Sequence, residues 1–272
     1  MAARFDIITG MGNEQTLSGQ VALVTGASRG IGRAIAVRLA AEGAAVAVNY
    51  RERAAEAEAV VNEIAASGGH AVAVQADISK PAEVAAMAKA IEGRLGAPGI
   101  LVNNAGVLRT GDLADFDFSQ MEYMRQTNVD GLVAVTRSVI GAMKERRYGR
   151  IVNLSSIAAM GTSFVGNTFY GATKAAVLLL TRRFAMDLGP YGITVNAIAP
   201  GFIVTDMVRQ GRSPEDAEAL IGRIAEKAMT RRTGTPEDIA HAVAFLVSPR
   251  SGFITAQTLT VDGGRMDYMN HP

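Results

Sequence analysis

The sequence predicts an α/β protein with one doubly wound domain, in which helices cover both faces of a seven-stranded parallel sheet. Three observations support this prediction. Short apolar runs rich in valine and isoleucine alternate with longer helical patterns along nearly the whole chain. These runs are apolar on both faces, which is typical of parallel strands buried between two helical layers. No linker, repeat or change of composition divides the 272 residues, so a single domain is the simplest interpretation.

The first half of the chain contributes four strands, each followed by a helix. Pro81 suits the first turn of a helix, and Gly68-Gly69 is typical of the end of one. The predicted strands lie at 20–26, 44–50, 70–77 and 99–106, and the helices at 31–42, 52–67, 81–96 and 118–146. This alternation of strand and helix predicts that neighbouring strands run parallel.

The second half contributes three more strands, and it also contains the part of the chain that we expect to close over a ligand. The strands are predicted at 149–156, 192–200 and 258–264, with helices from "YGATK" to about residue 188 and at 236–248. The stretch between Thr205 and Thr235 is rich in charge and is interrupted by Gly211, Ser213-Pro214 and Gly222. We expect a lid at about 205–228 that orders when ligands bind, with Arg209 and Arg212 as candidate contacts for an anionic tail.

Composition excludes several classes of function. The formal net charge is +1, from 27 basic and 26 acidic residues, so nothing indicates a nucleic acid or a membrane surface as partner. The chain has no cysteine, and His70, His241 and His271 lie far apart, so no metal site is predicted. Without a signal peptide or a membrane-spanning apolar run, we expect a soluble cytoplasmic protein with a flexible extension over 1–16 and its domain over 17–272.

The glycine-rich sequence "TGASRGIG" at 25–32 follows a predicted strand and opens a helix. Its Gly26, Gly30 and Gly32 are spaced G-x-x-x-G-x-G, which differs from the usual dinucleotide fingerprint. Glycines let the backbone approach a pyrophosphate, and the helix N-terminus offers unpaired N–H groups. The alternative is an ordinary glycine-rich turn between a strand and a helix.

The end of the second strand bears on the choice of cofactor. An acidic residue about twenty positions after the turn would accept the ribose hydroxyls of NAD. Here the strand ends in Asn49-Tyr50-Arg51, and Arg29 lies in the glycine turn. Guanidinium groups bind phosphate in a fork, so the two arginines favour NADP over NAD, unless both are simply solvated. We expect Glu52 to begin the next helix, where an acid suits the helix dipole.

Tyr170 and Lys174 of "YGATK" share one helix face, and an isolated pair of this kind is ordinarily just solvated. Together with "TGASRGIG" and "NNAG" at 103–106, however, the pair makes the chain resemble the short-chain dehydrogenase/reductase family. The resemblance covers about residues 18–264. Further matches are Asp77, Asn128 in "TNVDG", Ser156 in "NLSS" and the sequence "APGFIVTDM".

The resemblance implies a Rossmann-type fold and NADP(H)-dependent hydride transfer between nicotinamide and a carbonyl or secondary alcohol. Tyr170 would be the acid/base, and Lys174 would lower its pKa, which is ordinarily near 10, and hold the nicotinamide ribose. Ser156 would hydrogen-bond the substrate oxygen, whereas the neighbouring Ser155 would be structural. Asn128 would hold a water that links Lys174 to solvent.

The resemblance also implies which residues contact the cofactor. Asp77 and Ile78 would flank adenine, and hydride would pass at the pro-S face of the nicotinamide C4. The full implied set is Gly26, Ser28, Arg29, Gly30, Ile31, Gly32, Asn49, Tyr50, Arg51, Asp77, Ile78, Asn104, Ala105, Gly106, Tyr170, Lys174, Pro200, Gly201, Ile203 and Thr205.

Within the family, the chain is most similar in pattern to the 3-oxoacyl-[acyl-carrier-protein] reductases of fatty acid biosynthesis, which reduce a β-ketothioester. This resemblance implies an acyl carrier protein as partner and a homotetramer built on the helices at 118–146 and after Tyr170. Two departures leave alternatives open. The segment after "NNAG" differs, and Tyr191 stands where a second basic residue beside Arg147 is often found. The alternatives are a broad carbonyl reductase, a sugar or polyol dehydrogenase, and a non-catalytic NADP sensor, although a sensor should have lost part of the catalytic set.

Overall fold

The computed structural model describes residues 15–114, 116–162, 164–205, 208 and 213–267. Its seven strands form one parallel sheet in the order β3-β2-β1-β4-β5-β6-β7. The order reverses between β1 and β4, which makes this the switch point beside which ligands bind in such sheets. The doubly wound parallel sheet predicted from the sequence is therefore confirmed. The strands are β1 (Val21–Val24), β2 (Ala45–Tyr50), β3 (His70–Gln75), β4 (Ile100–Asn103), β5 (Gly149–Leu154), β6 (Ile193–Pro200) and β7 (Thr258–Val261).

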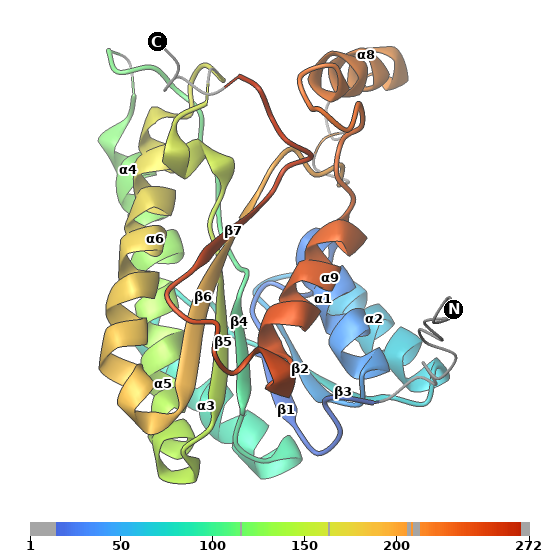
Figure 1. The fold of residues 1–272 in the computed structure, drawn as a ribbon, viewed down its shortest axis with the longest axis vertical. Coiled ribbons are helices and arrows are strands. Elements are labelled where there is room, and N and C mark those ends of the chain that lie inside the picture. Colours follow the sequence, from blue (N-terminus) through green and yellow to red (C-terminus); the bar gives the residue numbers. More distant parts are fainter. Residues whose placement is uncertain (1–14, 115, 163, 206–207, 209–212, 268–272) are drawn as a thin grey trace, which may run out of the picture.

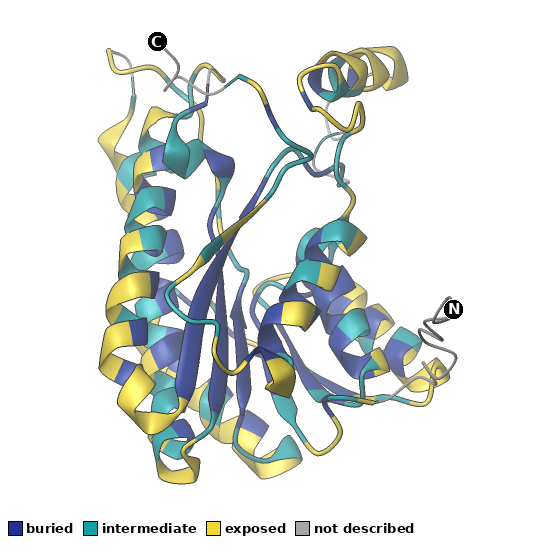
Figure 2. Cartoon of the chain, in the orientation of Figure 1, coloured by how far each residue is buried: buried dark blue, intermediate teal, exposed yellow. Residues whose placement is uncertain are grey.

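Helices cover both faces of the sheet, and each face has its own apolar core (Figure 1). One core joins the sheet to α1 (Gly30–Ala41), α2 (Ala54–Ala66) and α9 (Pro236–Val247). The other joins it to α3 (Pro81–Leu95), α5 (Leu132–Arg146) and α6 (Thr168–Leu188). In Figure 2 the central strands lie buried between the two layers, whereas β7 at the edge of the sheet is partly exposed. Because both faces are covered, every residue of β5 and β6 is buried, including the polar Asn153 and Asn196.

The single helix predicted over 118–146 is wrong in one respect, because it contains a break. The chain forms α4 (Phe118–Arg125), then a π-helical turn η1 (Gln126–Gly131), and then α5. Packing accounts for the break. A Cβ on Gly131 would lie 2.9 Å from Ile78, so the helix presses against the loop after β3. Such π-bulges occur often at functional sites.

The region predicted as a lid contains a helix, α8 (Pro214–Ala225), that the sequence analysis did not predict. The Ser213-Pro214 pair that we interpreted as a break in fact begins it. The Ser213 hydroxyl accepts a hydrogen bond from the Asp216 N–H, and proline occupies the first turn. In Figure 1 α8 stands apart from the sheet at the top of the molecule. Arg209 and Arg212 lie outside the described residues.

Both ends of the described chain are tied to the domain. Near the N-terminus, the Thr16 hydroxyl donates to Glu42 Oε2 at 2.9 Å, and Leu17 is fully buried. Near the C-terminus, the Thr230 and Met229 N–H groups donate to Gly263 and Gly264 at 3.1 and 3.0 Å. Residues 1–14 of the predicted extension and residues 268–272 lie outside the described part. Within the described residues, no helix is long and apolar enough to cross a membrane.

Candidate active site

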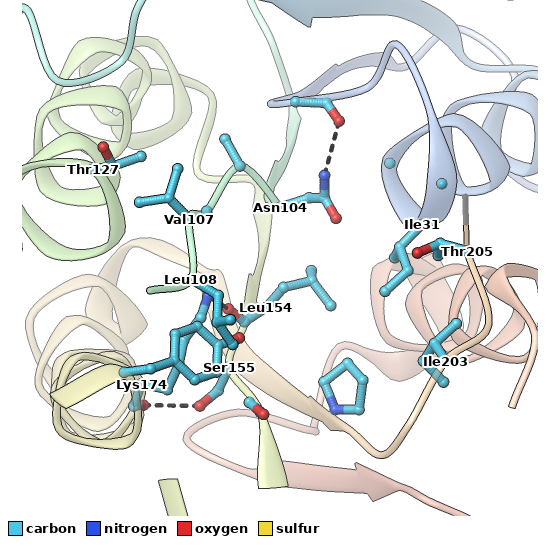
Figure 3. Close-up of a pocket in the computed structure, with 18 of the residues that line it drawn as sticks. Ile31, Asn104, Val107, Leu108, Thr127, Leu154, Ser155, Lys174, Ile203 and Thr205 are labelled. Atoms are coloured by element: carbon cyan, nitrogen blue, oxygen red, sulfur yellow. Dashed lines mark hydrogen bonds between the residues drawn. The ribbon is translucent and has the colours of Figure 1, made fainter. Parts of the chain in front are cut away.

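A cleft of about 660 Å³ opens at the carboxyl ends of the strands. Every residue that the resemblance assigns to cofactor contact lines it, and so does Ser156. Asn128 does not. Figure 3 shows Ile31, Ile203 and Thr205 on one side of the cleft and Leu108 and Lys174 on the other. The fold therefore brings residues from the loops after β1, β2, β3, β4, β5 and β6, and from α6, to one place.

The glycine turn after β1 has a shape that only glycine allows. Gly26 and Gly30 have φ angles of +62° and +54°, in the left-handed region. A Cβ on Gly32 would lie 2.4 Å from the Gly26 carbonyl oxygen. The residue that begins α1, Arg29, makes no side-chain capping hydrogen bond, so the first N–H groups of α1 lack a capping side chain. The glycine turn and the uncapped N–H groups at the start of α1 fit a dinucleotide pyrophosphate.

Two asparagines brace this turn from beneath. Asn49 is 2% exposed, and its Oδ1 accepts a hydrogen bond from the Gly26 N–H at 3.1 Å while its Nδ2 donates to the Ala76 carbonyl at 3.1 Å. Asn104 Nδ2 donates to the carbonyl oxygens of Thr25 and Gly26 at 2.8 and 3.1 Å (Figure 3). Asn49 thus shapes the turn while it lines the cleft, and its contact with the cofactor stays a prediction.

Arg51 lies at the end of β2 and is held by two neighbours. Its Nη2 lies 2.8 Å from Glu52 Oε1, and its Nη1 donates to the Tyr123 hydroxyl at 2.7 Å. The expectation that Glu52 begins a helix is wrong, because α2 starts only at Ala54. The acid in the first turn of α2 is Glu56 instead. Glu52 is thus left free to pair with Arg51 at the edge of the cleft.

Tyr170 and Lys174 lie on one face of α6, with Lys174 Nζ 5.8 Å from the centre of the Tyr170 ring. Lys174 Nζ donates to the Leu154 carbonyl at 2.8 Å, and burial lowers the pKa of Lys174 to about 8. Burial raises the pKa of Tyr170 to about 12, and a hydrogen bond with Ser156 acts in the opposite direction. In the protein without cofactor, desolvation is thus the largest effect on the pKa of Tyr170, and the lowering by Lys174 stays a prediction.

The two adjacent serines after β5 have different surroundings. Ser155 Oγ donates to the Lys174 backbone carbonyl at 2.8 Å, so it ties β5 to α6 (Figure 3). Ser156 Oγ accepts a hydrogen bond from the Ala158 N–H at 3.1 Å and also reaches Tyr170. Ser156 is thus the serine beside the Tyr170 hydroxyl.

Asn128 lies within η1 and is 2% exposed. Its Oδ1 accepts a hydrogen bond from the Val107 N–H at 2.8 Å, and its Nδ2 donates to the Val107 carbonyl at 2.9 Å and to Thr173 Oγ1 at 3.0 Å. Its side chain is therefore committed to bracing the segment after β4 against α6. The expectation that Asn128 holds a water for Lys174 stays a prediction, and it would fall to the backbone carbonyl of Asn128 because the side chain is occupied.

Sequence reasoning missed much of the cleft wall. The part that lies away from the glycine turn is mostly apolar, while Asn167 contributes a buried Oδ1 that has no partner among the described residues. Arg265 is buried and pairs with Asp267, at 2.7 Å from Nε to Oδ1. Only the position of Phe202, directly after the "PG" loop, could have indicated its place from sequence. The apolar wall is formed by Val107, Leu108, Ile157, Phe164, Phe202, Val208 and Leu220.

Comparison with known proteins agrees with this geometry. A sequence profile described as Enoyl-(Acyl carrier protein) reductase matches residues 26–266. The "3-oxoacyl-[acyl-carrier-protein] reductase FabG" of Staphylococcus epidermidis is 44% identical over 244 residues, which is 89% of this chain and 97% of the relative.

Solved structures give the same result. A short chain dehydrogenase of Burkholderia cenocepacia in complex with NADP has a TM-score of 0.82 and 39% identity, over 92% of this chain and 98% of that one. A 7 alpha-hydroxysteroid dehydrogenase complexed with NADH and a 7-oxo bile acid has a TM-score of 0.87 and 36% identity, over 95% of this chain and 98% of that one. With this cleft and these relatives, the chain belongs to the short-chain dehydrogenase/reductase family of nicotinamide-dependent oxidoreductases.

Proposed function

We propose that the chain is an NADP(H)-dependent reductase that converts 3-oxoacyl thioesters to 3-hydroxyacyl thioesters. The observation that carries this proposal is the 44% identity with a 3-oxoacyl-[acyl-carrier-protein] reductase, which extends over nearly the whole length of both chains. The cleft supports it, because the Ser156, Tyr170 and Lys174 side chains stand together beside an apolar wall that suits an acyl chain.

The residues of the cleft fit a nicotinamide dinucleotide, which supplies the hydride when bound. The glycine turn and the N-terminus of α1 hold the pyrophosphate. Ser156 and Tyr170 hold the carbonyl oxygen of the substrate, and the Tyr170 hydroxyl gives its proton to that oxygen as the carbonyl is reduced. A pKa of about 12 keeps Tyr170 protonated at neutral pH, as a proton donor in the reduction must be. Lys174, buried beneath, orients the ribose and the phenol.

NADP(H) is the proposed cofactor because cationic side chains gather where its extra phosphate would lie. Arg29 and Arg51 line this end of the cleft, and the nearby acid, Glu52, is paired with Arg51. We expect Arg29→Ala and Arg51→Ala each to raise the KM for NADPH about tenfold and to leave the KM for NADH nearly unchanged, since only NADPH carries the phosphate. Steady-state kinetics with both cofactors is the measurement. Equal effects on the two cofactors would remove the phosphate-binding role.

The activity test uses purified protein, NADPH and acetoacetyl thioester, followed by absorbance at 340 nm. We expect the absorbance to fall with the oxoacyl substrate and to stay flat with crotonyl thioester, which tests the enoyl reduction named by the family profile. A panel of apolar ketones, sugars and polyols runs beside them. Faster turnover of apolar ketones would favour a broad carbonyl reductase, the alternative that suits Leu108, Phe164 and Phe202 in the wall. A flat trace with every substrate would indicate a sensor.

An acyl carrier protein is the proposed macromolecular partner, and basic side chains on the outside of the domain support it. Arg147 donates to the Pro190 carbonyl at 2.9 Å. Lys144 Nζ lies 4.7 Å from the centre of the Tyr191 ring, so it supplies a cation beside the position where the sequence lacks one. We also infer a homotetramer and a cytoplasmic location, as the sequence analysis predicted.

A further inference from the structure

Arg51, the arginine proposed to bind the 2′-phosphate, has two partners with different chemistry. Glu52 is a carboxylate on a side chain that is 72% exposed, and an exposed ion pair of this kind contributes little to holding a side chain in place. Its charge also opposes a phosphate. Tyr123, by contrast, offers a neutral hydroxyl that accepts a hydrogen bond from Arg51 Nη1 at 2.7 Å. Of the two, only Tyr123 can fix the guanidinium without cancelling its charge.

Tyr123 is itself held firmly. It lies on α4 next to Met124, which is fully buried and anchors the helix. The guanidinium of Arg109 lies 5.2 Å from the centre of the Tyr123 ring, and Arg109 Nε donates to Gln120 Oε1 at 3.0 Å. The Tyr123 hydroxyl therefore has a defined position on α4, and its hydrogen bond with Arg51 joins α4 to the end of β2.

Arg51 and Tyr123 together keep enough free hydrogen-bond donors to bind a phosphate while they stay bonded to each other. An arginine has five N–H donors, so several remain when one is given to Tyr123, and a hydroxyl that accepts from Arg51 still has its own proton to donate. We propose that Tyr123 is a positioning residue that holds Arg51 for the 2′-phosphate and thereby sets the preference for NADPH over NADH. This inference rests on the cofactor proposed above.

The test compares wild type with Tyr123→Phe, which removes the hydroxyl and keeps the ring. The probes are adenosine 2′,5′-bisphosphate and 5′-AMP, which differ only in the 2′-phosphate, and calorimetry gives their Kd values. We expect the bisphosphate to bind about three- to tenfold more weakly, the range for one lost hydrogen bond, and AMP to bind unchanged. The KM for NADPH should rise in step, with kcat and the KM for NADH unaltered. Equal weakening of both probes would indicate a merely structural role and overturn the proposal.

Two further variants sharpen the result. Tyr191→Phe is a matched control, because Tyr191 also has a cation over its ring but lies far from Arg51 in the fold, beside Lys144 on α5, so neither Kd should change. In the Arg51→Ala background, Tyr123→Phe should cause no additional loss, and a further loss would overturn positioning through Arg51. If wild type binds the bisphosphate no more tightly than AMP, the proposed cofactor choice itself fails. If wild type shows the preference and Tyr123→Phe keeps it in full, only this inference falls.

Discussion

Burial of Tyr170 raises its pKa to about 12, so at neutral pH the side chain carries a proton that it can give to a substrate oxygen. Tyr170→Phe removes this proton and keeps the ring. We therefore expect kcat to fall by at least about 100-fold, as is usual when a general acid is lost, while NADPH still binds. Steady-state kinetics and a fluorescence titration with NADPH measure the two effects. A variant that retained most of its kcat would contradict the assignment.

Lys174 predicts how the activity depends on pH. Burial lowers its pKa from 10.5 to about 8, so the folded protein loses this charge as the pH rises through about 8, whereas Tyr170 keeps its proton up to about 12. We expect kcat/KM for NADPH-dependent reduction, which reports the free enzyme, to be level below about pH 7 and to fall above about pH 8. In Lys174→Arg the residual activity should lose this inflection. An unchanged inflection in that variant would assign it to another group.

At the scale of residues, the sequence predicts which side chains meet but not what each one does. The motifs locate Asn49 in the wall of the cleft, whereas Asn128 lies on η1 outside the cleft lining. Their roles depend on partners distant in the sequence, since Gly26 takes the amide oxygen of Asn49 and Val107 that of Asn128. The same holds for Tyr170, whose pKa follows from burial that no motif encodes.

Among the elements, the two that sequence missed have different physical causes. The break at η1 arises where Gly131 packs against Ile78, a contact between segments far apart in the chain. The α8 helix, by contrast, has a local signal in the Ser213 cap, the following proline and the acids of the first turn. The high charge of the segment and its glycines instead favoured a lid without a helix.

The α8 helix is the part of the proposed lid that the structure describes. Of its residues only Ala217 and Ile224 are buried, and a segment with so few apolar anchors opens easily. We expect the backbone amides of residues 213–228 to exchange rapidly in the free protein and to become protected when NADP and substrate bind. Hydrogen exchange followed by mass spectrometry measures this, with the well-packed α9 as internal control. Equal exchange with and without ligands would mean a static wall.

For the molecule as a whole, the sequence predicted the fold well because burial on both faces leaves a simple pattern. Strands such as β1 and β4 are almost wholly apolar, so the alternation of strands and helices is visible without knowledge of any contact. The substrate wall had no such pattern, because it combines residues as distant as Leu108, Phe164 and Arg265.

The outer surface predicts how copies of the chain associate. Leu179 and Met186 on α6 are 61% and 66% exposed, and Phe245 and Phe253 near β7 are 54% and 103% exposed. Covering such apolar groups favours association, so we expect a tetramer by light scattering at micromolar concentration, with these two patches as separate interfaces.

Introducing a negative charge on the α6 patch should split the expected tetramer. Leu179→Glu should reduce the particle to a dimer, because an apolar interface would have to desolvate the new carboxylate. Phe253→Glu should do the same through the other patch. A wild-type protein that stayed monomeric would contradict both interfaces.

The packing of α9 on α1 has a consequence for the order in which the protein is made. Residues of α1 leave the ribosome early, yet the core that they share with Ile239 and Val243 of α9 cannot close until nearly the whole chain has been synthesised. The glycine turn that α1 supports must wait equally long for its final shape. Chains stalled before α9 would therefore expose the apolar face of α1 and depend on chaperones, even though most of the sheet had already been translated.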